Sequence, residues 1–401
     1  MSYSNIGAQQ LDEQNLGQDI PYMLSLTPSV VTTSDAGAGI GYTGFRVRGS
    51  DPTRINVTID GIPLNDPESQ GVWWVNMPDF TSSVEDIQIQ RGVGTSTNGA
   101  GAFGASINLK TQTLRAKPYA TTSNTIGSYS TLKNNVEFGT GLLADKFTVD
   151  GRLSRISSDG YIDRATSNLK SLYLSGAYYG TDEVLKLSLI SGKEKTYQAW
   201  NGVPLSYLDD DSLRTYNYYT YENETDNYWQ DHYVLNYNKQ LANSGTFNLG
   251  LHFTHGEGYY EQYKNGQDFA DYGLNNVIVG NDTLTETDLI RRKWLDNDFY
   301  GAVFSYNNRK DKLDYTLGGG WNTYEGRHYG VVRWAEYASN SQIDHIYYDN
   351  DGIKTDFNLY AKSHYQYSDD VTVYADLQHR QIYYSFLGKD ENGAERNDTV
   401  N

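Results

Sequence analysis

The sequence contains no cysteine, and its 401 residues include only three methionines and eight prolines. Without cysteine the chain can form neither a disulfide framework nor a thiolate metal site, so cysteine content gives no indication of compartment. No stretch approaches the roughly 18 consecutive apolar residues that a membrane-spanning helix requires. No charged start followed by an apolar core comes after Met1. We therefore expect a mature or cut form of the protein.

Positive charge is also scarce. The chain has 32 Lys and Arg against 50 Asp and Glu, which gives a formal net charge of −18 and a pI of about 4.7. A nucleic-acid partner would need a basic footprint, and this composition argues against one. The simplest explanation of the acidic excess is that it solvates exposed loops.

Aromatic residues and glycine are abundant: the sequence has 36 Tyr, 12 Phe, 7 Trp and 39 Gly. The mean hydropathy of −0.65 is that of a soluble protein. A transmembrane β-barrel can have the same value, because only alternate residues of each strand face lipid and the lumen side stays polar. The hydropathy therefore does not exclude a membrane protein.

Alternating apolar and polar residues recur from about residue 118 to residue 385. In the clearest case, Phe247, Leu249, Leu251 and Phe253 alternate with polar or small residues. This period of two places one face in lipid and the other in water. The pattern predicts about eleven strands: 118–126, 131–141, 146–157, 169–180, 183–193, 228–240, 245–256, 297–308, 312–325, 353–367 and 371–385.

The connections between these strands alternate in length. Segments 142–145, 180–182, 241–244, 309–311 and 368–370 are short, whereas 158–168, 194–227, 257–296 and 326–352 are long. Outer-membrane barrels have tight periplasmic turns and long outer loops. A β-sandwich or a propeller is not expected to lengthen every second loop. The pattern favours an antiparallel transmembrane barrel.

The first hundred residues have a different pattern, with short apolar strands at 45–48, 55–59, 87–90 and 105–110 separated by glycine-rich turns. Asp60-Gly61 is a strong hairpin signal because both turn positions need positive φ. Five segments occur in a specific order, and together they resemble the plug domain of TonB-dependent receptors: Thr27-Pro28-Ser29-Val30, Val47-Arg48-Gly49, Ile59-Asp60-Gly61-Ile62-Pro63, Ile87-Gln88-Ile89-Gln90-Arg91-Gly92 and Gly104-Ala105-Ser106-Ile107-Asn108-Leu109-Lys110-Thr111.

The resemblance implies a mainly β protein, with a globular plug at residues 1–115 and the N-terminal part of an antiparallel transmembrane β-barrel at 116–401. Outer-membrane transporters with a plugged lumen have about 22 strands, so eleven is about half of a barrel. An open half-barrel leaves unpaired edges in lipid, and residues 398–401 are polar. We expect a fragment that stops inside an external loop. No energy-coupling box is recognisable near the N-terminus.

Arg48 and Arg91 each follow a short apolar strand and precede a glycine. Such a guanidinium can be an ordinary solvated charge in a wet lumen. The resemblance implies more, since these positions match plug arginines that pair with barrel glutamates through bidentate hydrogen bonds. Those glutamates belong to later strands, so no partner is assigned here.

We expect ligand contacts from the long loops, because aromatic faces mixed with amides suit either a sugar or a chelator. Tryptophans in such loops can also bury against the wall, and some rings can belong to an aromatic girdle. The plug-loop candidates are Asp35, Tyr42, Asp66, Glu68, Gln70, Trp73, Trp74 and Asn76. The external-loop candidates are Trp200, Tyr207, Tyr216, Tyr218, Tyr219 and Tyr221, with Tyr228 and Trp229 beside them.

Other motifs do not support a cofactor, a metal or catalysis. Residues 99–104 match G-x-G-x-x-G, but a strand rather than a helix is expected after them, which argues against a nucleotide enzyme. His252 and His255 would face opposite sides of a strand, as a lumen and a rim imidazole. Segments 209–211 and 349–352 lack calcium-loop spacing and are expected to be solvated turns. We recognise no set of nucleophile, base and orienting acid.

The resemblance therefore predicts a receptor in the outer membrane of a Gram-negative bacterium, in contact with outer-membrane lipid and energised by the TonB–ExbB–ExbD complex. Its ligand would be a small-molecule chelate or a saccharide. Segment 59–66 is most similar to siderophore-type plugs, which favours a ferric siderophore or a similar iron chelate. Uptake of cobalamin or an oligosaccharide remains an alternative. A ligand-sensing signalling receptor is another, although only about forty residues precede Phe45.

Overall fold

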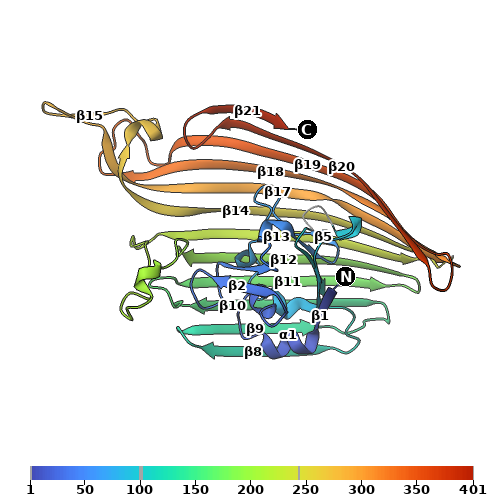
Figure 1. Ribbon diagram of the computed structural model, residues 1–401. Coiled ribbons are helices and arrows are strands. Elements are labelled where there is room, and N and C mark those ends of the chain that lie inside the picture. Colours follow the sequence, from blue (N-terminus) through green and yellow to red (C-terminus); the bar gives the residue numbers. More distant parts are fainter. Residues whose placement is uncertain (1, 99–102, 243, 401) are drawn as a thin grey trace.

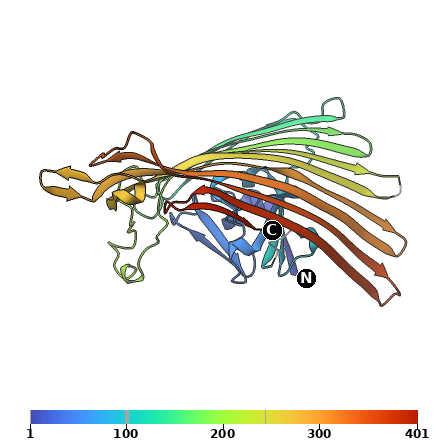
Figure 2. The same cartoon turned by 90° about the horizontal axis from the view of Figure 1, so that it is seen from above.

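The computed structural model describes residues 2–98, 103–242 and 244–400. These residues form a small N-terminal unit (residues 2–111) that lies against one large sheet, which we call the wall (Figure 1). Seen from above, the wall is curved and the N-terminal unit lies on its concave side (Figure 2). No helix in the described part of the chain is long and apolar enough to cross a membrane.

The N-terminal unit is built on a five-stranded sheet of order β1-β6-β7-β4-β5, with a separate pair β2-β3. Only β4 and β7 pair in parallel. Two short helices, which the alternating pattern did not indicate, precede β2. The elements are β1 Ser2–Gly7, α1 Ala8–Gln14, α2 Ile20–Met23, β2 Val30–Ser34, β3 Thr43–Val47, η1 Pro52–Arg54, β4 Ile55–Ile59, β5 Ile62–Pro63, η2 Trp74–Asn76, η3 Phe80–Ser83, β6 Val84–Arg91, η4 Ser96–Asn98 and β7 Ala105–Thr111.

The Asp60-Gly61 turn has the geometry that the dipeptide predicts. Both residues have positive φ, 50° and 87°, and Ile59 pairs directly with Ile62. The Asp60 carboxylate also accepts a hydrogen bond from the Thr111 amide at 2.9 Å. The turn is therefore fixed to the end of β7.

The wall has twelve strands, and every neighbouring pair is antiparallel. The strands follow the chain order, except that the small hairpin β15-β16 is inserted between β14 and β17. This confirms the predicted antiparallel meander. The strands are β8 Tyr119–Gly127, β9 Thr131–Gly139, β10 Phe147–Ser158, β11 Ser167–Tyr179, β12 Glu183–Tyr197, β13 Thr225–Gln240, β14 Thr246–Asp268, β17 Glu286–Lys310, β18 Leu313–Ala335, β19 His345–Gln366, β20 Thr372–Lys389 and β21 Glu395–Val400. The inserted segment holds η6 Phe269–Tyr272, β15 Val277–Val279 and β16 Asp282–Leu284, and η5 Leu205–Tyr207 lies between β12 and β13.

Three expectations are wrong in this region. There are twelve strands rather than eleven, because Glu395–Val400 pairs with β20 and is not a loop. Residues 349–352 lie inside β19 rather than in a solvated turn. Much of the predicted long connections 257–296 and 326–352 is also strand. Apolar residues in these segments stand in adjacent pairs, such as Leu289-Ile290 and Val331-Val332, beside register shifts in the sheet, so they carry no regular alternation by which a strand could be recognised.

Side chains alternate between the two faces of the wall as expected. On β10, Arg152 and Ser154 are buried toward the N-terminal unit, whereas Leu153 points away and is 55% exposed. Tyr173 of β11 and Ile190 of β12 belong to the same buried cluster as Met77 and Phe80. The hydrophobic core thus continues from the N-terminal unit into the wall.

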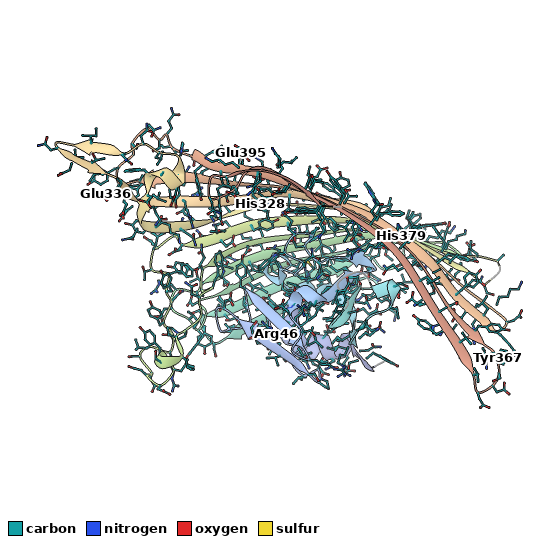
Figure 3. The ribbon with its side chains drawn as sticks, turned by 45° about the horizontal axis from the view of Figure 1, so that its top comes forward. Arg46, His328, Glu336, Tyr367, His379 and Glu395 are labelled. Atoms are coloured by element: carbon teal, nitrogen blue, oxygen red, sulfur yellow. The ribbon has the colours of Figure 1, made fainter. Side chains whose placement is uncertain are left out.

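The long strands have two distinct ends. Figure 3 places Glu336, which follows β18, at the end with the long connections, and Tyr367, which follows β19, at the end with the short turns. His328 is labelled on β18 between these ends. The cavity described next is lined by β18 residues at the level of His328.

Candidate functional site

A cavity of about 960 Å³ lies between the N-terminal unit and the wall. One side is formed by residues 63–77 of the N-terminal unit, and the other by strands from β12 to β20. A cavity of this size is within the range of small-molecule sites. It is the candidate functional site.

The loop that enters the cavity is held by its own side chains. Asp66 Oδ1 accepts hydrogen bonds from the amides of Glu68 (3.1 Å) and Ser69 (2.6 Å). Asn65 accepts from the Val57 amide at 2.7 Å and donates to the Ile55 carbonyl at 2.9 Å. Burial raises the pKa of Asp66, although the bonds from Ser69 oppose the shift. The loop is therefore preorganised before any ligand arrives.

Glu68, at the tip of this loop, is bound by three residues of the wall. Its Oε2 is 2.8 Å from His328 Nε2 and 2.8 Å from the Tyr324 hydroxyl, and its Oε1 is 3.0 Å from the Tyr384 hydroxyl. Burial alone would raise the pKa of Glu68, but these hydrogen bonds and the His328 imidazole outweigh it and lower the pKa. Lys354 also donates to the Pro67 carbonyl. The loop tip is thus fixed to β18, β19 and β20.

Aromatic rings form another part of the lining. The centre of the Trp200 ring lies 5.6 Å from that of Tyr42 and 5.4 Å from that of Tyr260, edge-on in both cases. The centre of the Tyr42 ring lies 6.0 Å from that of Trp73. The Tyr42 hydroxyl donates to Asp226. Burial, with nearby carboxylates, raises the pKa of Tyr42 well above its usual value. Tyr42 therefore stays a neutral donor.

The cavity is strongly acidic. Its lining includes seven carboxyl side chains and one lysine, Lys293, which is already paired with Glu391. Burial raises the pKa of Asp35 to about 6, so this carboxyl is partly protonated near neutrality. A ligand that donates hydrogen bonds or carries positive charge fits this lining better than an anion does.

Six of the eight plug-loop candidates line the cavity: Asp35, Tyr42, Asp66, Glu68, Trp73 and Asn76. Trp74 lies instead in the core of the N-terminal unit, where it is 4% exposed and packs beside Phe45. Gln70 is at the turn of the loop and donates to the Pro67 carbonyl at 2.5 Å. The structure therefore separates the two adjacent tryptophans, placing Trp73 at the cavity and Trp74 in the core.

Among the external-loop candidates, Trp200 lines the cavity and the five tyrosines are not part of its lining. Tyr219 contacts Trp200 edge-on at 6.2 Å, and Tyr207 packs on Tyr216 at 5.2 Å. Tyr218, which packs on Tyr219, is 64% exposed. The Tyr221 hydroxyl donates to Glu261 at 3.0 Å.

Most wall residues of the site were not among the sequence candidates. They lie inside strands, where alternation shows only that a residue faces inward and gives no indication of which part of the N-terminal unit lies opposite. Tyr228 was named only as a loop aromatic, yet it lines the cavity from β13. The others include Glu194, Asp226, His232, Tyr260, Asn297, Tyr324, His328 and Phe386.

The expected anchoring arginines lie near each other. Arg91 Nη1 donates to the Pro28 carbonyl at 3.2 Å. Gly92 follows Arg91, and a Cβ atom added to this glycine would lie 3.9 Å from Arg48 Nη1. Their pairing with barrel glutamates stays a prediction.

The strongest contact between the N-terminal unit and the wall uses Asp79 instead. Its Oδ1 is 2.6 Å from Lys133 Nζ, and its Oδ2 accepts from Asn135 and Ser154, each at 2.6 Å. The Asp79 side chain has no exposed surface and that of Lys133 has 2%. Burial would raise the pKa of Asp79, but Arg152 and Lys133 lower it to about 2.

The histidine pair and the glycine-rich segment noted in the sequence do not come together in one site. His252 is bound to Asn322 at 2.8 Å and His255 to Asp298 at 2.9 Å, so the two imidazoles have different partners. In the described residues there is no group of three or more potential metal ligands. The G-x-G-x-x-G segment lies largely outside the described residues, and strand β7 follows Gly104.

The family-model match and the similar solved structures agree with each other. Residues 1–106 match the family model of the TonB-dependent receptor plug domain. No curated protein matches the chain. Solved structures with a similar fold include FpvA of P. aeruginosa bound to heterologous pyoverdines (TM-score 0.69, 13% identity, 100% of this chain and 52% of that one). Others are the ferric-catecholate import receptor Fiu of E. coli K12 (0.71, 15%, 100% and 64%) and the unliganded ferric citrate transporter FecA (0.72, 14%, 99% and 58%). The chain thus spans roughly half to two thirds of the solved chains that it matches.

Proposed function

We propose that this chain is the plug and the first barrel strands of a TonB-dependent outer-membrane receptor that takes up a scarce ligand, namely a ferric siderophore or a similar iron chelate. The plug-domain match over residues 1–106 and the shared fold of the whole chain support this proposal. The outer membrane of a Gram-negative bacterium is the corresponding location. Residues 1–115 would act as the plug and residues 116–401 as the barrel part.

One observation carries the proposal. The cavity is lined by both the plug loop and the wall, and the same loop is tied to the wall through Glu68. A ligand bound there touches both parts, so binding can alter how they are held together. This is the coupling that an energised receptor needs.

The ligand class follows from the lining and from the neighbours. FpvA, Fiu and FecA are described as receptors for pyoverdine, ferric catecholate and ferric citrate. For the present chain, the excess of carboxyl groups favours an uncharged or cationic iron chelate over an anionic one. An uptake receptor for cobalamin or an oligosaccharide is the second candidate, because the rings of Trp73, Trp200 and Tyr260 also suit a sugar or a corrin edge.

Energy would come from a TonB–ExbB–ExbD complex acting on the plug, and the lipid of the outer membrane would surround the wall. We infer no catalytic role for the cavity and no resident cofactor. Iron in this proposal is cargo.

The segment between β12 and β13 would close over the ligand. It carries Trp200, which already lines the cavity, and the tyrosine cluster of residues 207–221. Deleting residues 207–222 from the intact receptor is expected to leave membrane insertion unchanged and to lower affinity. Protease added to whole cells should cut the segment. If protease cut the segment only from the periplasmic side, the orientation proposed for every strand would have to be inverted.

The ligand itself is tested by titrating the receptor with a neutral ferric trihydroxamate and an anionic ferric tris-catecholate, followed by uptake of radioactive iron with and without a proton-motive force. We expect Trp200→Ala to weaken binding by roughly five- to 150-fold, since an aromatic contact with a ligand contributes about 1 to 3 kcal/mol. Trp334→Ala is the matched control, because Trp334 is absent from the lining. Equal binding by both variants, or tighter binding of the anionic chelate, would contradict the proposed site or the proposed ligand charge.

A further inference from the structure

Three cations lie in one row across the wall. Arg155 of β10 is the register partner of Lys170 of β11, and Lys170 is the register partner of Lys193 of β12. Cβ atoms of such partners are roughly 5 Å apart, and like charges directly opposite each other are destabilising. The row continues into Trp229 of β13, with Lys193 Nζ 5.9 Å from the centre of its ring.

The row lies on the face opposite the N-terminal unit. The intervening residues on the same strands point the other way: Ser154 bonds to Asp79, and a Cβ on Gly192 would lie 1.9 Å from the Asn76 carbonyl oxygen. Arg155, Lys170 and Lys193 therefore share the face of Leu153 and Leu172, and all three cations are exposed. On β10, β11 and β12 this face is apolar toward the short turns, and the cations come where the apolar run ends.

No acid in the described part of the chain lies within ion-pair distance of the row. Neither Arg155, Lys170 nor Lys193 forms an ion pair there. Elsewhere on the same sheet, arginines have their own acids, as in Arg327 with Asp349 and Arg380 with Asp356. In a chain with a net charge of −18, an unneutralised row of three cations needs a separate explanation.

A hollow of about 470 Å³ on this face is lined by the three cations, by Asn134 and Ser191, and by Leu153 and Leu172. Its lining thus combines anion-binding groups with an apolar floor. We propose that this row binds the phosphorylated headgroup of a lipid in the outer leaflet, with the phosphate among Arg155, Lys170 and Lys193 and an acyl chain along the leucines. The phosphate would offset the repulsion within the row.

This inference is independent of the ligand cavity, so its failure would leave the uptake proposal untouched. The test uses the intact receptor in detergent and measures the binding of a bisphosphorylated lipid A by native mass spectrometry. We expect the triple variant R155Q/K170Q/K193Q to bind about a hundredfold more weakly, because each cation facing an anionic lipid contributes roughly a factor of five. The single variant K170Q, at the centre of the row, should lose roughly fivefold.

The matched control is K146Q/K310Q/K312Q, which removes the same charge at the short-turn end of the wall and should bind like the wild type. Dephosphorylated lipid A should bind wild type and triple variant equally weakly. Heat resistance of the folded barrel verifies that each variant is intact. Undiminished binding by the triple variant and by K170Q, or phosphate-independent binding to the wild type, would overturn the proposal. So would inorganic phosphate that binds as tightly as the lipid, since the source would then be a free anion.

Discussion

Two of the contacts that hold the N-terminal unit to the wall, at Asp79 and at Glu68, are built differently. At η3, Asp79 is fully enclosed with Lys133, Asn135 and Ser154. At the loop tip, Glu68 is bound by His328, Tyr324 and Tyr384, and its side chain and that of His328 remain 19% and 33% exposed. A buried ion pair is costly to break, whereas a hydrated one exchanges readily with water. The difference indicates a permanent anchor at Asp79 and a releasable one at Glu68.

The largest effect is expected when the buried anchor loses its charge. Asp79→Asn leaves Lys133 buried without a counter-ion, which should reduce the free energy of unfolding by about 3–5 kcal/mol. Denaturant titration of the intact receptor, followed by fluorescence of the buried Trp74, measures this. Asp51→Asn is the control, because Asp51 pairs with Arg46 at a side chain that is 43% exposed. A loss no greater than that of the control would show that the Asp79 anchor is dispensable.

A smaller effect is expected from adding one methyl group at each anchor. A Cβ at Gly192 would lie 1.9 Å from the backbone oxygen of Asn76 in η2, close to Asp79, and neither backbone can yield cheaply. Gly192→Ala should therefore cost about 1–3 kcal/mol of stability. At Gly352 the nearest atom is Oε1 of Glu68, at 2.3 Å, which is the end of a flexible side chain. Gly352→Ala should loosen the loop at little cost in global stability, below about 1 kcal/mol.

Both substitutions are compared with Gly176→Ala, where the nearest atom would be 3.9 Å away. Thermal unfolding gives the stability change, and hydrogen exchange of residues 64–72 gives the loosening. If Gly352→Ala destabilised the receptor as much as Gly192→Ala, the two anchors would be equally rigid.

The smallest effect is expected from acid. Glu68 has a pKa lowered by its wall partners, so its contribution to stability is present above the usual glutamate value of 4.5 and is lost as the pH falls through the lowered pKa. The contribution of Asp79 is lost only near its own pKa of about 2. On acidification from pH 5, the loop at 66–71 should therefore open before η3 does, with a change of about 1 kcal/mol at an exposed contact.

Hydrogen exchange at pH 5, 4 and 3 tests this order, and Glu68→Gln should remove the pH dependence of the loop. If η3 opened first, or if both segments opened together, the contacts at Glu68 and Asp79 would not open independently and the predicted order would be wrong.

The sequence predicts four strands of the N-terminal unit, β3, β4, β6 and β7, and the antiparallel order of the wall, because residues such as Val57 and Leu249 belong to alternating apolar patterns. It missed β1, β2 and β5, and it did not predict the ends of β14, β17, β18 and β19, where apolar residues such as Leu289 and Val332 do not alternate regularly with polar ones. It gave Tyr42, Glu68 and Trp73 as ligand-contact candidates because of their loops, and all three line the cavity. It missed His328 and Asp79, because the contact across 260 residues between His328 and Glu68 arises only when the N-terminal unit is placed in the wall.

The wall is much longer on one side than on the other: β8 has 9 residues, whereas β17 has 25. At about 3.3 Å per residue and a tilt of roughly 45°, β17 rises about 55 Å, against a hydrocarbon layer of about 30 Å. In the proposed outer-membrane receptor, the ends of β14 to β19 would therefore project above the bilayer, where Phe269, Tyr272 and Tyr347 pack together. A large molecule that approaches the proposed receptor from outside would meet these projecting strand ends before the cavity. Substitutions that disrupt the binding of such a molecule could therefore arise there without changing the cavity lining.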